Sequence, residues 1–227
     1  MKPIVAIDGP AGSGKSTASR GAARELGYLY IDTGAMYRAA ALAAQRAGLD
    51  LSDDLAVSEF CRNLDIGFGA PGSREDGSAP VLLAGEDVSD QIRTREIAMM
   101  ASDFSQKPAL RKRLTAIQRS LGASGGVVME GRDIGTVVFP EARAKFFVSA
   151  SPAERARRRC EELQAAGQEA DLGAIEREIR ARDAQDAGRA HAPLKKAADA
   201  EEIDSTAMSI EDVIARIVAR VKAIEGS

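Results

Sequence analysis

Eight residues near the amino terminus have the spacing of a loop that wraps around phosphate groups. They are Gly9, Pro10, Ala11, Gly12, Ser13, Gly14, Lys15 and Ser16, and they match G-x-x-x-x-G-K-[ST] at every fixed position. Glycines let backbone N–H groups turn toward phosphate oxygens, and a following helix adds the positive end of its dipole. The lysine can reach the β and γ phosphates, and the serine hydroxyl can ligate Mg²⁺. The pattern predicts an ATP site, a P-loop, that also includes Thr17.

Glu130 is a second candidate, because it ends a buried-strand pattern over 126–130. An acid at this place could lie beside the P-loop and, with Ser16, orient Mg²⁺ or its waters. The alternative is an ordinary carboxylate at the end of a strand, and the sequence leaves both readings open.

Arginines recur in short polar motifs along the chain. Phosphoryl transfer between two nucleotides needs positive charge, because the donor and acceptor phosphates repel each other, and arginine binds phosphate with two donors at once. In the run 155–159, Arg155, Arg158 and Arg159 share a helical face, which favours them over Arg157 for contact with the transferred group. We assign Arg155 and Arg158 to catalysis; the alternative is a solvated helix face.

The elements that must position these residues alternate between strands and helices. We expect strands at 3–7, 28–31, 126–130 and 144–150, a weak strand at 201–204, and helices at 15–26, 34–47, 152–165, 172–187 and 209–224. This alternation favours an α/β fold with a parallel sheet flanked by helices.

The stretch 52–105 breaks the alternation and is the best candidate for an inserted subdomain. It begins with an expected helix at 52–63, with Ser52 as its N-cap. A strand at 64–68, a loop and a strand at 81–83 could form a hairpin. Helices are expected at 90–104 and 108–121.

Composition excludes several classes of protein. The 227 residues include 31 Lys and Arg against 34 Asp and Glu, a net charge of −3, which argues against general nucleic-acid binding. No apolar run approaches the roughly 18 residues that span a bilayer. The start of the chain does not fit a signal peptide, and Cys61 and Cys160 form no CxxC unit, so we expect a cytoplasmic protein with reduced thiols and no membrane partner.

The motifs, in their order, resemble the bacterial cytidylate kinase family of P-loop nucleoside monophosphate kinases. The guanine-reading motifs NKxD and TKxD of GTPases do not occur. After the P-loop, the most specific match is Gly-Arg-Asp-Ile-Gly-Thr-Val-Val-Phe-Pro at 131–140. The other matching segments are 7–10, 31–38, 85–89, 182–183 and 204–206.

The resemblance implies an adenylate-kinase-like P-loop fold and a monomeric enzyme that transfers the γ-phosphoryl group of ATP to CMP or dCMP with Mg²⁺. It implies a single domain over 1–227, whose parts are a core at 1–51, 106–154 and 191–227, a monophosphate-binding insertion at 52–105 and a lid at 155–190. The lid should close on the substrates, since an open site would hydrolyse ATP.

The resemblance also assigns residues. It adds Arg132 and Arg182 to Lys15, Arg155 and Arg158, which completes the catalytic set. The acceptor nucleotide would be bound by Thr33, Arg38, Ser102, Arg111, Arg132, Asp133, Arg182, Asp186 and Arg189. Arg38, Arg132 and Arg189 would bind its phosphate, and Asp186 a ribose hydroxyl with Arg182 close by. Asp133 could accept from the cytosine amine, while Arg111 and Ser102 serve the acceptor edge of the base.

Other interpretations remain open, both for the activity of the protein and for the roles of single residues. Arg182 and Asp186 are also spaced as a surface ion pair on a helix. The enzyme could instead phosphorylate UMP, AMP or a non-nucleotide. A P-loop module that switches a partner's affinity without turnover would leave the acceptor arginines unexplained.

Overall fold

The computed structural model describes residues 2–74, 78–165, 167–189 and 192–226. The chain forms two compact units, one from residues 1–31 and 125–227 and the other from 32–124. The two units are described in turn.

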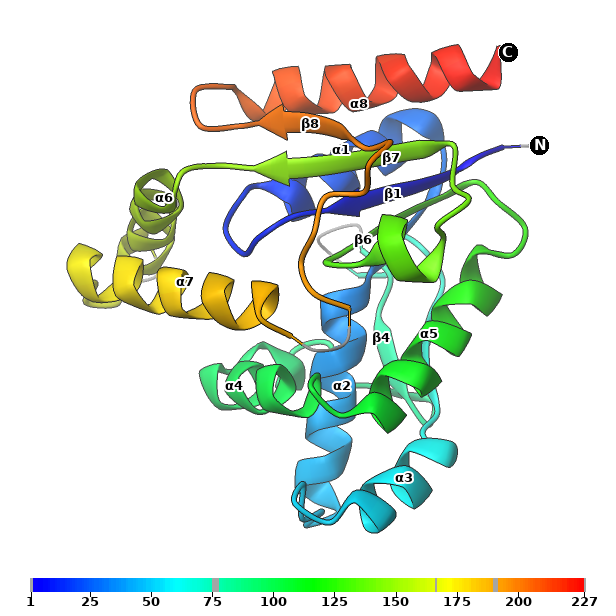
Figure 1. Ribbon diagram of the computed structural model, residues 1–227, viewed down its shortest axis with the longest axis vertical. Helices are drawn as coiled ribbons and strands as arrows, with labels where there is room; N and C mark the ends of the chain where they lie inside the picture. The colour runs from blue at the N-terminus through cyan, green and yellow to red at the C-terminus, as the bar shows by residue number, and fades with distance from the viewer. Residues whose placement is uncertain (1, 75–77, 166, 190–191, 227) are drawn as a thin grey trace. The chain divides into compact units, whose positions relative to one another are not determined.

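The first unit is built on the predicted parallel sheet, which has five strands in the order β2-β6-β1-β7-β8. Figure 1 labels β6, β1, β7 and β8 of this sheet. The strands are β1 Ile4–Asp8, β2 Leu29–Asp32, β6 Val127–Gly131, β7 Ala144–Ser149 and β8 Glu201–Asp204. β1 lies between β6 and β7, with Ile7 opposite both Glu130 and Phe146. The weakly apolar strand at 201–204 is confirmed, since β8 pairs in parallel with β7.

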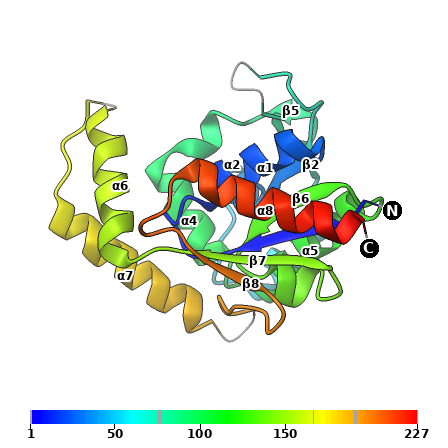
Figure 2. The same cartoon turned by 90° about the horizontal axis from the view of Figure 1, so that it is seen from above.

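Helices α1 (Lys15–Leu26) and α8 (Ile210–Glu225) cover one face of this sheet side by side, as Figure 2 shows. Their contact face buries Ala18, Ala22, Val213 and Ile217 against strand residues such as Phe146. The small side chains of α1 explain its close fit to the sheet. Two further helices, α6 (Pro152–Ala165) and α7 (Leu172–Ala187), pack against each other.

Parallel strands bring their carboxyl ends to one edge of a sheet, where α/β proteins bind ligands. Here that edge carries the P-loop after β1 and the short π-helical turn η2 (Ile134–Val138) beyond β6. It also carries the start of α6 after β7 and Ser205 after β8. The strand order thus gathers four segments that are far apart in the sequence.

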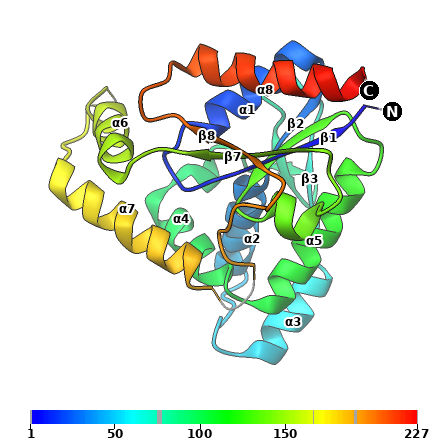
Figure 3. The same cartoon turned by 45° about the horizontal axis from the view of Figure 1, so that its top comes forward.

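The second unit combines helices with an antiparallel sheet of three strands, β3-β4-β5. Its elements are α2 Thr33–Arg46, α3 Asp54–Arg62, β3 Ile66–Phe68, β4 Val81–Leu83, β5 Glu86–Asp87, η1 Gln91–Arg93, α4 Arg95–Phe104 and α5 Pro108–Gly122. α4 packs against α2, and α3 against α5 (Figure 3). The predicted hairpin is confirmed by the pairing of Ile66 with Leu83.

Two local predictions in this unit are wrong. The N-cap of α3 is Asp53 and not Ser52, because the Asp53 carboxylate accepts from the backbone N–H groups of Leu55 and Ala56. The helix expected at 90–104 is divided, since Thr94 is extended and caps α4 by accepting from Ile97 N–H. Both corrections concern which polar side chain accepts hydrogen bonds from the backbone N–H groups of the first helical turn.

The compact unit at 32–124 is wider than the insertion expected at 52–105, and it takes in α2 and α5 as well. The division into core, insertion and lid by function stays a prediction. Among the described residues, no helix has both the length and the apolar composition that crossing a membrane requires.

Candidate functional site

The P-loop has the backbone that its glycines predict. Gly12 and Gly14 have φ of 76° and 79°, in the left-handed region that favours glycine. Gly9 is needed for another reason, because a Cβ there would collide with the carbonyl oxygen of Val148 on β7. The loop therefore fits closely against the sheet and leads into α1, whose N-cap is Gly14.

Lys15 and Ser16 open α1. Lys15 is buried, and its Nζ donates to the carbonyl oxygen of Pro10 at 3.2 Å, across the loop. Ser16 is exposed, and its Oγ donates to Glu130 Oε2 at 3.0 Å. Glu130 is 2% exposed near the end of β6, so of the two readings left open, the structure favours an acid beside the P-loop.

These residues bear on the Mg²⁺ prediction. In the part of the chain that the structure describes, no group of three or more His, Cys, Asp or Glu side chains could hold a metal ion. A P-loop site needs none, because Mg²⁺ there uses a hydroxyl, water and the nucleotide phosphates. Ser16 Oγ and Glu130 Oε2 are hard oxygen donors and fit that arrangement.

Arg155 lies against the P-loop. Its side chain is 3% exposed, and Nη1 donates to the carbonyl oxygen of Ala11 at 3.1 Å. The same guanidinium holds Asp183 of α7 with both terminal nitrogens, one bond being 3.0 Å long. Asp183 thus fixes a buried cation beside the phosphate loop, a role that the sequence reading did not assign to it.

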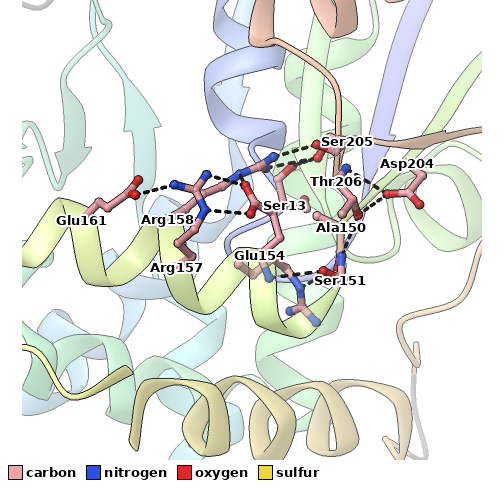
Figure 4. Close-up of polar contacts among 11 residues, drawn as sticks. Ser13, Ala150, Ser151, Glu154, Arg157, Arg158, Glu161, Asp204, Ser205 and Thr206 are labelled. Carbon is pink, nitrogen blue, oxygen red and sulfur yellow. Dashed lines mark hydrogen bonds and ion pairs between the residues drawn. The ribbon is translucent and has the colours of Figure 1, made fainter. Parts of the chain in front are cut away.

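Arg158 lies beside Ser205, which contacts the loop at Ser13 (Figure 4). Its Nη2 donates to the carbonyl oxygen of Ser205 at 2.6 Å and its Nη1 to Ser205 Oγ at 3.2 Å. Ser205 is buried, and its hydroxyl donates to the carbonyl oxygen of Ser13 at 2.9 Å. A Cβ on Gly14 would lie 3.4 Å from Arg158 Nη1, so the guanidinium is next to the loop.

The other arginines of the run lie outside this group. Arg157 is 55% exposed and pairs with Glu154 and Glu161. Hydrogen bonds from Arg157 first, and then from Arg158, lower the pKa of Glu154 to about 2. Arg159 is also exposed and pairs with Glu162, so the face it was expected to share with Arg155 does not bring it to the loop.

Asp8 joins the P-loop to the segment that contains Arg132 and Asp133. Its two carboxylate oxygens each accept a backbone N–H at 2.8 Å, from Ile134 and from Gly135. Asp8 is 4% exposed, and desolvation by burial raises its pKa to about 6 against the opposing effect of those two hydrogen bonds. The Asp133 charge raises it further, and Arg132 lowers it. Sequence reasoning missed Asp8, although it directly precedes Gly9.

Asp186 brings two predicted acceptor arginines together. Its Oδ2 lies 2.9 Å from Arg132 Nε, and its Oδ1 lies 2.6 Å from Arg189 Nη2. Asp186 is 2% exposed, and Arg132 and Arg189 are largely buried. α7 ends at Ala187 with Gly188 as its cap, so Arg189 reaches Asp186 from beyond the helix. Arg182 is exposed on α7.

The remaining predicted acceptor ligands belong to the second unit. Thr33 is buried at the start of α2, where Asp32 caps the helix by accepting from Ala35 N–H. Arg38, one turn further, donates through Nη2 to Asp32 Oδ2 at 3.0 Å. Asp32 therefore orients Arg38 and fixes the helix start at once.

Arg111 and Ser102 are joined through Ser105. Ser105 Oγ donates to the carbonyl oxygen of Ser102 at 2.7 Å, and Arg111 Nη1 donates to the carbonyl oxygen of Ser105 at 3.1 Å. The guanidinium carbon of buried Arg111 also lies 5.6 Å from the ring centroid of Tyr37. Stacking on an aromatic ring holds an arginine in place without neutralising its charge.

Comparison with known proteins places these motifs in context. A family model described as cytidylate kinase matches residues 5–223. The chain is 52% identical over 219 residues to a curated protein named cytidylate kinase from Citrifermentans bemidjiense, covering 96% of this chain and 92% of that protein. A cytidylate kinase from Pelotomaculum thermopropionicum is 50% identical over 221 residues, which cover 97% and 96%.

A bifunctional pantoate ligase/cytidylate kinase from Synechococcus elongatus is 46% identical over 218 residues, covering 96% of this chain but 41% of that protein. Among solved structures, TT1252 from Thermus thermophilus overlaps with 99% of this chain and 98% of its own at a TM-score of 0.49 and 16% identity. A likeness at that level carries no argument about activity.

Proposed function

Because this chain belongs to the cytidylate kinase family, we propose that it transfers the γ-phosphoryl group of ATP to CMP or dCMP, giving ADP and CDP or dCDP. The observation that carries this proposal is the match of the family model to residues 5–223. The P-loop that follows β1 supports the use of a nucleoside triphosphate as donor.

On the donor side, the loop's backbone N–H groups and Lys15 bind the β and γ phosphates. Ser16 and Glu130 would hold Mg²⁺, which, when bound, neutralises charge on the phosphate oxygens. Arg155 and Arg158 add positive charge next to the loop, at Ala11 and at Gly14. They are held beforehand by Asp183, Ser205 and Glu154, so little reorganisation is needed when charge develops during transfer.

On the acceptor side, Arg132 and Arg189 bind the phosphate of CMP, and Arg38 adds a third cation. Asp186 keeps Arg132 and Arg189 together before the acceptor arrives. When the phosphate takes over these guanidinium groups, the Asp186 carboxylate is available for a ribose hydroxyl, with Arg182 close by. The ionised acceptor oxygen is itself the nucleophile, so positioning and charge neutralisation suffice.

The base would be read by Asp133, Arg111 and Ser102, and the Thr33 hydroxyl would contact the nucleotide. Asp133 accepts from the cytosine amine, whereas a uracil has a carbonyl oxygen at that position and would leave the acid facing an acceptor. Arg111 donates to the acceptor edge of the base from its place on Tyr37. Uracil also carries an N3–H donor where cytosine has the N3 acceptor, so it would face Arg111 with a second mismatch. Discrimination between cytosine and uracil therefore rests on two exchanged positions.

We also propose that residues 155–190 act as a lid and that the enzyme works as a cytoplasmic monomer on small-molecule substrates only. The lid would exclude water from the transferred group. The two free cysteines, Cys61 and Cys160, fit a reducing compartment.

An assay of ADP release coupled to NADH oxidation tests the function across CMP, dCMP, UMP, AMP and GMP. We expect kcat/KM for CMP or dCMP to exceed that for UMP at least about tenfold, since each buried donor–acceptor mismatch costs about 1–3 kcal/mol. Turnover mainly with AMP would refute the cytosine assignment. ATP binding without any acceptor-dependent turnover would favour a nucleotide-binding switch instead.

A further inference from the structure

Tyr30 contacts the acid that lies beside the P-loop. Its phenol oxygen donates to Glu130 Oε1 at 2.5 Å, while Ser16 Oγ donates to the other oxygen, Oε2, at 3.0 Å. Tyr30 is on β2 and Glu130 on β6, and these strands are neighbours in the sheet. Each oxygen of the buried carboxylate therefore accepts a hydroxyl hydrogen from a different element.

The Ser16 and Tyr30 hydroxyl groups differ in how firmly their surroundings hold them. Ser16 is exposed at the first turn of α1, where its hydroxyl would also face Mg²⁺ and the nucleotide. Tyr30 is half-buried, and Arg20 lies over its ring with 5.6 Å between the guanidinium carbon and the ring centroid. The phenol is thus fixed from its ring, and it in turn fixes the rotation of the Glu130 carboxylate.

We propose that Tyr30 is a positioning residue for the Mg²⁺·nucleotide site. Its hydroxyl turns Glu130 so that Oε2 faces Ser16 and the place where Mg²⁺ and its waters would lie. The inference rests on the proposed function, because it assumes that Ser16 and Glu130 hold the metal. Groups that orient a metal site from one step away commonly change metal affinity about 10–100-fold when removed.

The chain offers a matched control two residues away. Tyr28 has the same chemical contact, since its phenol oxygen donates to Glu225 Oε1 at 2.6 Å. Glu225 is at the end of α8, and no function is assigned to it. Tyr28→Phe and Tyr30→Phe therefore each remove one hydroxyl bonded to one glutamate, and only the second touches Glu130.

The experiment measures ADP binding by titration calorimetry on the full chain, with Mg²⁺ and again with EDTA. For Tyr30→Phe we expect affinity for ADP with Mg²⁺ to fall about tenfold, while affinity in EDTA stays within about twofold. Tyr28→Phe should leave both affinities within about twofold. Manganese binding followed by electron paramagnetic resonance should show the same loss for Tyr30→Phe.

The double variant tests the route through Glu130. In a Glu130→Gln background, adding Tyr30→Phe should change Mg²⁺-dependent affinity by less than about twofold, because the group it positions is already altered. A tenfold loss in that background, an equal loss with and without Mg²⁺, or no loss at all would each overturn the proposal. The proposed function is tested separately by the coupled assay on the unaltered protein. CMP-dependent turnover there, together with any of these three results, would overturn the Tyr30 proposal alone.

Discussion

The Asp8 carboxyl makes the free energy of unfolding depend on pH, in the opposite direction to most carboxylates. Burial raises its pKa from 3.8 to about 6, so the folded protein keeps a proton that the unfolded chain has already released. Between these pKa values the folded state binds more protons than the unfolded state. The contribution of Asp8 to stability therefore falls as pH rises, the reverse of a carboxylate in a favourable ion pair.

The magnitude follows from linkage. A shift from 3.8 to about 6 corresponds to about 3 kcal/mol between low pH and neutral pH. The same relation gives a loss of about 1.4 kcal/mol between pH 5 and pH 7.5. Asp8→Asn removes the titrating group, and its amide can satisfy only one of the two N–H groups, which adds a roughly constant cost of about 1–3 kcal/mol.

The assay is denaturant unfolding of the unaltered protein and of Asp8→Asn at both pH values. The constant cost cancels in the difference between pH values, and all other titrating groups are common to both proteins. We expect the change from pH 5 to pH 7.5 to differ by about 1.4 kcal/mol, the unaltered protein losing more. Equal changes would refute the reasoning, as would a carboxyl carbon titration by NMR that places the pKa of Asp8 near 4.

Two further predictions concern the phosphate loop. Lys15→Ala should lower kcat at least about 10³-fold in the coupled assay, because the lysine stabilises negative charge on the transferred phosphoryl group. The far-ultraviolet circular dichroism spectrum should stay unchanged, because the lysine contributes little to the packing of the fold. Near-normal turnover would contradict the P-loop assignment. Arg155→Ala should lower kcat about 10²–10³-fold, whereas Arg157→Ala, at an exposed ion pair, should stay within about twofold. Equal effects of both would show that contact with the loop does not matter.

Much of the fold could be predicted from the sequence where the signal is local. The P-loop pattern is contiguous, and its glycines have the backbone angles that their spacing implies. The apolar runs before Gly9 and before Glu130 predict buried strands, and both are central in the sheet. The sequence does not show which of two neighbouring polar residues caps a helix. Ser52 and Asp53 are both good N-cap residues, and only the structure shows that Asp53 caps α3.

Ion pairs show what sequence spacing alone leaves out. Arg182 and Asp186 are four residues apart and suggest a pair within one helix. The structure gives Asp186 close contacts with Arg132, from the loop after β6, and with Arg189, from beyond the helix. Spacing reports which side chains can share a helix face, but a buried carboxylate is satisfied by whichever cations the tertiary fold brings to it.

The chemistry of this protein can be read from its sequence: a phosphate loop, an acid near the end of a strand, and arginines in an order that fits one kinase family. The residues that orient those groups are known only from the fold. The Tyr30 hydroxyl donates a hydrogen bond to Glu130, which is 100 residues away in the sequence. The backbone N–H of Gly135 donates to Asp8, which is 127 residues away. The reason is the strand order, which puts β6 between β2 and β1; periodicity reveals that a strand is buried, but not which strands lie beside it.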